Sequence, residues 1–133
     1  MTEPDELFGE VISRYSREQA LRDGALVDVS EMAAEAGFVL PTAMTAAAWA
    51  DLVAWGKDSG PMLQDEAGRL WDVLYLGMLA ARKEREQSEV RYEVFRVPSG
   101  ELSTVAEPVQ VVVHCGPGDE REPVLTIMLD TER

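Results

Sequence analysis

The sequence contains one cysteine and one histidine, and this shortage excludes several kinds of site. Cys115 has no second cysteine to pair with inside the chain, as is typical of proteins from reducing compartments. His114 and Cys115 are neighbours on a predicted strand, so their side chains point to opposite faces and cannot share a metal ion or form a nucleophile–base pair. No CxxC, HxxxH, GxSxG or phosphate-binding glycine motif is present. We therefore predict no catalytic residues, no metal and no cofactor.

Long apolar runs and a basic N-terminus are also missing. The chain starts with the acidic segment 1–6, whereas a secretory signal starts with basic residues followed by an apolar stretch. The longest apolar runs, 46–50 and 73–81, fall far short of the ~20 residues that cross a bilayer. We expect a cytoplasmic protein that does not associate with membranes.

Basic residues are few: 12 stand against 25 acidic residues, for a net charge of −13. Residues 1–66 hold 13 of the acidic side chains and only 4 basic ones. Such a chain is not expected to bind nucleic acid directly, because neutralising phosphates requires lysine and arginine. A basic protein surface would instead be attracted and steered toward it. The alternative, that the acidic residues serve only solubility, stays open at this point.

The order of the predicted elements indicates an α+β fold. The capping box of Ser16 and Gln19 starts a helix that Gly24 ends, and Gly37 ends the next one. We expect one domain over residues 1–133, with residues 1–6 flexible. N-terminal helices should pack on a C-terminal three-stranded antiparallel sheet, with one short early strand. Helices are predicted at 17–23, 31–36, from Thr42 or Thr45 to about 55, and 65–86, and strands at 25–29, 90–97, 109–115 and 124–129.

Three segments carry a resemblance to a known family. They are residues 15–30 with 34–38, Pro41, Thr45 and Trp49; Arg69-Leu70-Trp71-Asp72-Val73-Leu74; and Cys115-Gly116-Pro117-Gly118-Asp119 followed by 122–124. Together they resemble a family of small acidic bacterial proteins carried on plasmids, integrative elements and prophages. The resemblance implies a setting in which small acidic proteins often act as anti-defence factors against CRISPR effectors or restriction enzymes. It implies no catalytic residues.

The first functional hypothesis is a non-enzymatic inhibitor from a mobile genetic element. Its carboxylates would occupy the basic surface of a host defence protein or complex that handles nucleic acid, in the manner of an anti-CRISPR or anti-restriction protein. The acidic residues that we predict to contact this partner are Asp5, Glu6, Glu10, Asp23, Glu31, Glu35, Asp58, Asp65 and Glu66.

Two alternatives belong to other functional classes. One is a small enzyme or ligand-binding domain with a pocket around Asp28, Trp49, Trp71 and Asp72, where carboxylates and aromatic rings interrupt apolar segments. The alternative interpretation of the buried-segment carboxylates is structural, as helix-cap acceptors or ion-pair partners. Asp28 would accept backbone N–H groups at the next helix start, and Asp51 and Asp72 would have either of these two roles. The other alternative is a homodimeric scaffold in which exposed aromatic side chains pair.

Overall fold

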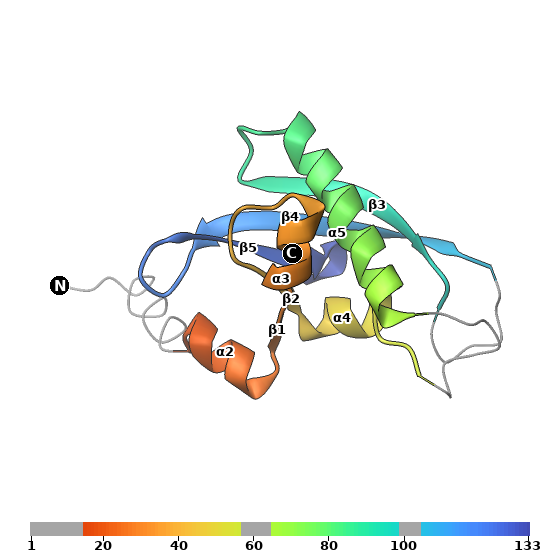
Figure 1. The fold of residues 1–133 in the computed structure, drawn as a ribbon, viewed down its shortest axis with the longest axis horizontal. Coiled ribbons are helices and arrows are strands. Elements are labelled where there is room, and N and C mark those ends of the chain that lie inside the picture. The colour runs from red at the N-terminus through yellow and green to blue at the C-terminus, as the bar shows by residue number, and fades with distance from the viewer. Residues whose placement is uncertain (1–14, 57–64, 99–104) are drawn as a thin grey trace.

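A computed structural model describes residues 15–56, 65–98 and 105–133, which build helices around a five-stranded mixed sheet (Figure 1). This confirms the α+β class. The strand order across the sheet is β1-β2-β5-β4-β3. The strands are β1 (Leu26–Asp28), β2 (Thr42–Thr45), β3 (Glu89–Arg96), β4 (Glu107–Pro117) and β5 (Pro123–Leu129). The helices are α2 (Arg17–Asp23), α3 (Ser30–Ala36), α4 (Ala46–Leu52) and α5 (Glu66–Lys83), and the 3-10 turn η1 (Asp130–Glu132) closes the chain.

The predicted three-stranded antiparallel sheet is present as the meander β3-β4-β5, but it is only part of the sheet. The prediction missed β2, which pairs parallel with β5 and antiparallel with β1. Met44 of β2 lies opposite Ile127 on one side and Val27 on the other. Residues 42–44 are fully buried, so the segment lacks the apolar–polar alternation that marks a half-buried strand. Thr45, rather than Thr42, caps the following helix, which ends at Leu52 and not near 55.

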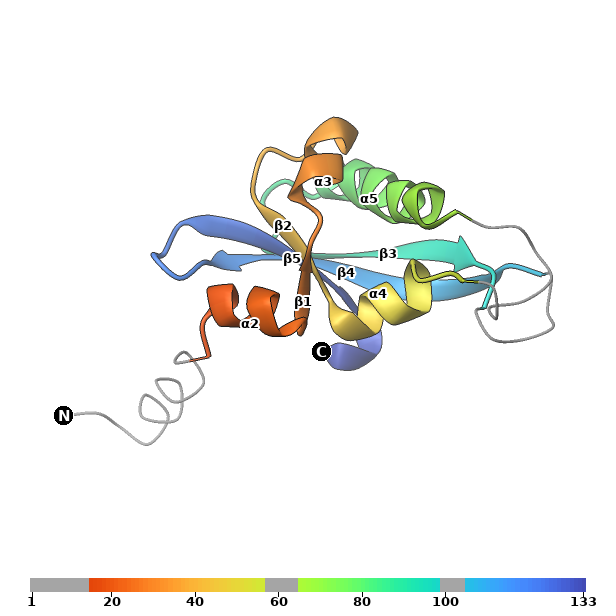
Figure 2. The same cartoon turned by 60° about the horizontal axis from the view of Figure 1, so that its bottom comes forward.

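The core lies between the sheet and the α3–α5 pair. Figure 2 shows α3 and α5 on one side of the sheet and α2 on the other. Alternate residues of the central strands, among them Met44, Ile127 and Val111, meet the buried stripe of α5. That stripe includes Leu70, Val73, Leu74 and Gly77, as its helical spacing predicts. Among the described residues, no helix is both long and apolar enough to cross a membrane.

The β4–β5 hairpin, which joins two of the predicted strands, is hydrogen-bonded to α2. Asp119 at its tip accepts hydrogen bonds from the backbone N–H groups of Arg17 at 2.7 Å and Glu18 at 3.0 Å. The Arg17 guanidinium donates to Thr126 Oγ1 at 2.9 Å and to the carbonyl of Leu125 at 2.7 Å. Together with the confirmed Ser16 capping box, these bonds satisfy the first N–H groups of α2. The hairpin therefore fixes the position of α2, although the two segments are about a hundred residues apart in the sequence.

Contact between α5 and β3 depends on a glycine. Tyr92 is buried beneath α5, and its hydroxyl donates to the carbonyl of Val73 at 2.9 Å. Burial raises the pKa of the Tyr92 phenol well above its ordinary value, so the ring stays neutral. A Cβ at position 77 would lie 2.8 Å from the Tyr92 hydroxyl oxygen. Gly77 is thus required by this close approach and not by its backbone angles.

Gly77→Ala is expected to destabilise the protein by about 1–3 kcal/mol, because the added methyl group collides with Tyr92. In an unconstrained helix the same change would stabilise by up to about 1 kcal/mol. The cost should shrink in a Tyr92→Phe background, which removes the colliding oxygen. Urea unfolding of the two single variants and the double variant measures this coupling.

Gly68→Ala is the matched control in the same helix, because its Cβ would meet nothing closer than Asp65 Oδ2 at 3.8 Å. It should be neutral or stabilising. An equal cost of Gly77→Ala with and without the Tyr92 hydroxyl would contradict this account of the contact.

Candidate protein-binding site

The start of α3 is fixed by strands β1 and β2. Asp28 Oδ1 accepts a hydrogen bond from the backbone N–H of Ser30 at 2.9 Å, which confirms the prediction that this carboxylate accepts a backbone N–H at the helix start. Ser30 Oγ accepts the N–H of Thr42 at 2.9 Å and donates to its carbonyl at 3.2 Å. The predicted helix began at residue 31, but Ser30 is already the first residue of α3, and Val29 holds the cap position without a side-chain bond. The hydroxyl of Ser30 bonds to β2 instead, so α3 starts at a defined place beside the sheet.

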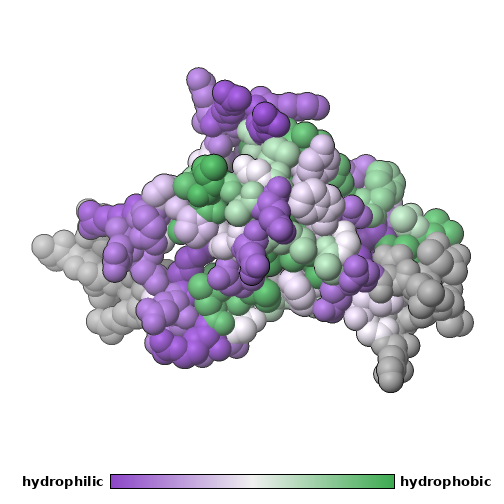
Figure 3. All heavy atoms as spheres, in the orientation of Figure 1, coloured by the Kyte–Doolittle hydropathy of each residue, from purple (hydrophilic) through white to green (hydrophobic). Residues whose placement is uncertain are grey.

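A surface hollow of about 420 Å³ opens beside this helix start. Asp28, Glu31 and Glu35 supply carboxylates to its lining, and Val29, Met32 and Leu70 supply apolar surface. Glu31 and Glu35 are one helical turn apart, and within the described parts of the chain neither carboxylate takes part in a hydrogen bond or an ion pair. Figure 3 shows strongly hydrophilic surface over α3, bordered by smaller apolar areas.

This combination of groups suits a lysine or arginine side chain from another protein. Such side chains lay an aliphatic stem on apolar surface while the charged head reaches polar partners. The stem would rest on Met32 and Leu70, and the head would meet carboxylates that line the hollow. Hydrogen bonds between an arginine and carboxylates are among the stronger ones in proteins.

A family model described as "Family of unknown function (DUF6573)" matches residues 7–133. The chain belongs to this family. No curated protein and no solved structure matches it. The family assignment thus covers the hollow and the whole described fold, and the description attached to the family specifies no activity.

The other predicted partner contacts that fall among the described residues, Asp23, Asp65 and Glu66, do not line this hollow. Asp23 is the last residue of α2. Asp65 caps α5 by accepting the N–H of Ala67, and Glu66 accepts the N–H of Trp55 at 2.9 Å. Both carboxylates are therefore engaged by the backbone. Four further residues of the predicted set, Asp5, Glu6, Glu10 and Asp58, lie outside the described residues.

The four residues of the alternative pocket lie in different surroundings. Asp28 lines the hollow at α3, whereas Asp72 lines a much smaller one with Leu52, Arg69 and β3 residues. Trp49 packs against the core, and Trp71 is 38% exposed and stacks on Tyr75. Neither tryptophan lines either hollow.

Groups for metal or nucleophilic chemistry are not gathered in the described parts of the chain. No cluster of three or more His, Cys, Asp or Glu side chains suited to a metal ion occurs among those residues. His114 and Cys115 are adjacent on β4, where His114 pairs with Thr126 and Cys115 with Leu125 of β5. Successive side chains of a strand point to opposite faces, which is the arrangement predicted for this pair.

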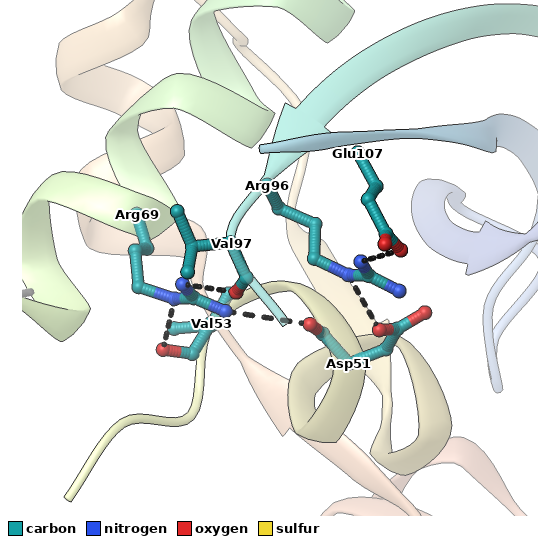
Figure 4. A network of polar contacts seen from close by, with 6 residues as sticks. All are labelled: Asp51, Val53, Arg69, Arg96, Val97 and Glu107. Atoms are coloured by element: carbon teal, nitrogen blue, oxygen red, sulfur yellow. Dashed lines mark hydrogen bonds and ion pairs between the residues drawn. The ribbon is translucent and has the colours of Figure 1, made fainter. Parts of the chain in front are cut away.

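The sequence did not lead us to predict that an arginine is buried in the fold. Arg69 of α5 is only 6% exposed, and Figure 4 shows its guanidinium reaching the ends of α4 and β3. Nε donates to the carbonyl of Val53 at 3.1 Å, Nη1 to that of Val97 at 3.0 Å, and Nη2 more weakly to that of Asp51 at 3.4 Å. The guanidinium also lies 4.8 Å from the centre of the Trp55 ring.

Backbone carbonyls accept the hydrogen bonds of the Arg69 guanidinium, and the nearby carboxylate of Asp51 pairs with a different arginine, Arg96. Burial, and then the neighbouring charge of Arg96, lowers the pKa of the Arg69 guanidinium, which still remains charged at neutral pH. The Asp51 carboxylate forms an ion pair with Arg96 at 2.8 Å, which is one of the two structural roles predicted for it. Arg69 lies on the buried face of α5, four residues before Val73, and this position was the signal that could have identified it.

Arg69→Met is expected to cost roughly 2–4 kcal/mol of folding stability, because it leaves buried carbonyls without donors. Arg69→Lys should also destabilise, since one ammonium group cannot reproduce the planar fork. Chemical unfolding measures both. Arg22→Met is the control, because Arg22 forms only an exposed pair with Glu18 and should change stability by less than about 0.5 kcal/mol. Similar costs at the two arginines would contradict the anchoring role.

Proposed function

We propose that this chain is a non-enzymatic inhibitor that binds a basic, nucleic-acid-handling surface of a host defence complex. The observation that carries the proposal is the hollow at α3, where the carboxylates of Asp28, Glu31 and Glu35 surround apolar surface and the last two have no partner among the described residues. A net charge of −13 adds long-range attraction toward a basic partner.

The uneven use of the carboxylates supports α3 as the contact. Asp51, Asp119 and Asp130 are held by arginines or by backbone N–H groups inside the fold. Asp65 and Glu66 support the start of α5 in the same way. Glu31 and Glu35 make no such bond within the described parts of the chain, so binding a cation there breaks none of the described bonds. The cost of desolvating them on binding is met by the partner's charge.

A nucleic-acid groove provides the matching chemistry. Such grooves present rows of lysine and arginine that neutralise phosphates, and a carboxylate surface competes for the same cations. The interaction must therefore weaken with added salt, because exposed charges are screened over about 10 Å at 0.1 M. The resemblance to proteins of plasmids, integrative elements and prophages supports a defence complex as the target, of the CRISPR or restriction type.

The double reversal Glu31→Lys with Glu35→Lys is expected to weaken partner binding at least about tenfold, because a repulsive pair of cations replaces the attractive carboxylates. The chain is immobilised, and nucleic-acid-binding proteins of a bacterial lysate are captured at low salt. Binding of the captured protein is then titrated against salt and against added DNA or RNA. Nucleic acid should displace the chain.

The matched control is Glu84→Lys with Glu86→Lys, which makes the same charge change just beyond α5. This variant should keep most of the binding. If both double variants bind alike, or if nucleic acid and the chain bind the captured protein together, the proposed site is wrong.

A further inference from the structure

One row of side chains on the outward face of α5 has no partner within the described fold. Asp72, Leu76, Leu79 and Lys83 are spaced by four, three and four residues, so they follow one line along the helix. All four are exposed, Leu76 by 38% and Leu79 by 36%. Within the described residues, neither Asp72 nor Lys83 makes a hydrogen bond or an ion pair. We call this row the α5 seam.

The α5 seam is complementary to itself when it is reversed. Spacings of three and four are those of a helix–helix contact, in which two such rows interlock. Read from either end, the seam has a charged residue, two leucines and a residue of the opposite charge. An antiparallel copy therefore places Asp72 opposite Lys83 of the second copy, and Leu76 opposite its Leu79. A parallel copy would place like charges together, which is unfavourable.

We propose that α5 pairs antiparallel with α5 of a second copy, about a two-fold axis that passes between Leu76 and Leu79. The two leucine layers would lie at the centre, and an Asp72–Lys83 ion pair would close each end. Such an isologous contact is the usual form of a homodimer. Because the proposed contact uses α5 and leaves the hollow at α3 open, it does not rest on the proposed inhibitor function.

The surroundings of the α5 seam leave room for a second helix. On one side the stacked rings of Trp71 and Tyr75, with centroids 5.8 Å apart, extend the apolar strip. On the other side a hollow of about 370 Å³ separates Leu76 and Leu79 from β3. Side chains of the second copy could enter this hollow and cover apolar surface that one chain leaves in water. A contact built from one helix pair is small, so we expect a dimer that dissociates on dilution.

Sedimentation equilibrium over a wide concentration range tests this dimer with the full chain. The mass should rise from that of one 14.7 kDa chain toward twice that value. Asp72→Lys and Lys83→Asp should each raise the dissociation constant at least about tenfold, because each places like charges at both ends of the seam. Both sites are exposed, so the variants should keep the wild-type circular dichroism spectrum.

Two rescues make the test specific to the α5 seam. The double variant Asp72→Lys with Lys83→Asp restores opposite charges and should dimerise like wild type. An equal mixture of the two single variants should form a heterodimer, because one chain is basic at both ends and the other acidic. Glu31→Lys is the control and should not affect dimerisation. A wild-type chain that stays monomeric throughout, or a dimer that the single variants leave unchanged, would overturn the proposal.

Discussion

The guanidinium of Arg69 is the only charged side chain that the described fold takes almost wholly out of water. It lies where α5, the end of α4 and the end of β3 meet. It donates hydrogen bonds to backbone carbonyls at the end of α4 and just after β3, which would otherwise lack donors. Asp51 connects it to Arg96, so a chain of polar contacts runs from α5 through α4 to β3 and β4. Because a buried charge without partners is costly, this junction tolerates little displacement.

The candidate site depends on that junction through its neighbours. Leu70 follows Arg69 directly and forms part of the apolar lining beneath the carboxylates of α3. About two turns further along α5, Met78 approaches Gly37 so closely that a Cβ on Gly37 would lie 3.3 Å from the Met78 Cγ. Gly37 also has a φ of 115°, a backbone conformation that only glycine adopts readily. Anchoring α5 therefore also sets the position of α3 and of Glu31 and Glu35.

Local signals predicted most of the helices and the C-terminal meander. The capping box at Ser16, the glycine after α2 and α3, and the buried stripe of α5 each depend on residues within a turn or two, and all are present. Contacts between distant segments were not predictable in this way. The parallel pairing of β2 with β5 joins residues more than 80 apart, and the Asp119 carboxylate reaches α2 across a similar span.

The acidic surface shows the same limit. Composition showed that carboxylates are plentiful. It could not separate those that accept backbone N–H groups, such as Asp65 and Glu66, from those without a partner among the described residues, such as Glu31 and Glu35. Trp71 and Tyr75 are exposed on α5 because the sheet and α3 cover only its opposite side. Sequence periodicity shows which face of a helix is apolar. Which other elements pack against that face depends on the arrangement of the whole fold.

The most direct measurement of the central claim is amide hydrogen exchange of the chain, alone and bound to a nucleic-acid-binding protein captured at low salt. If the carboxylates of α3 form the contact, exchange should slow on binding across residues 28–37, which carry the hollow, and stay unchanged at the C-terminal end of α5. Slowing confined to elements away from α3, or no slowing at all in a complex that has formed, would contradict the claim.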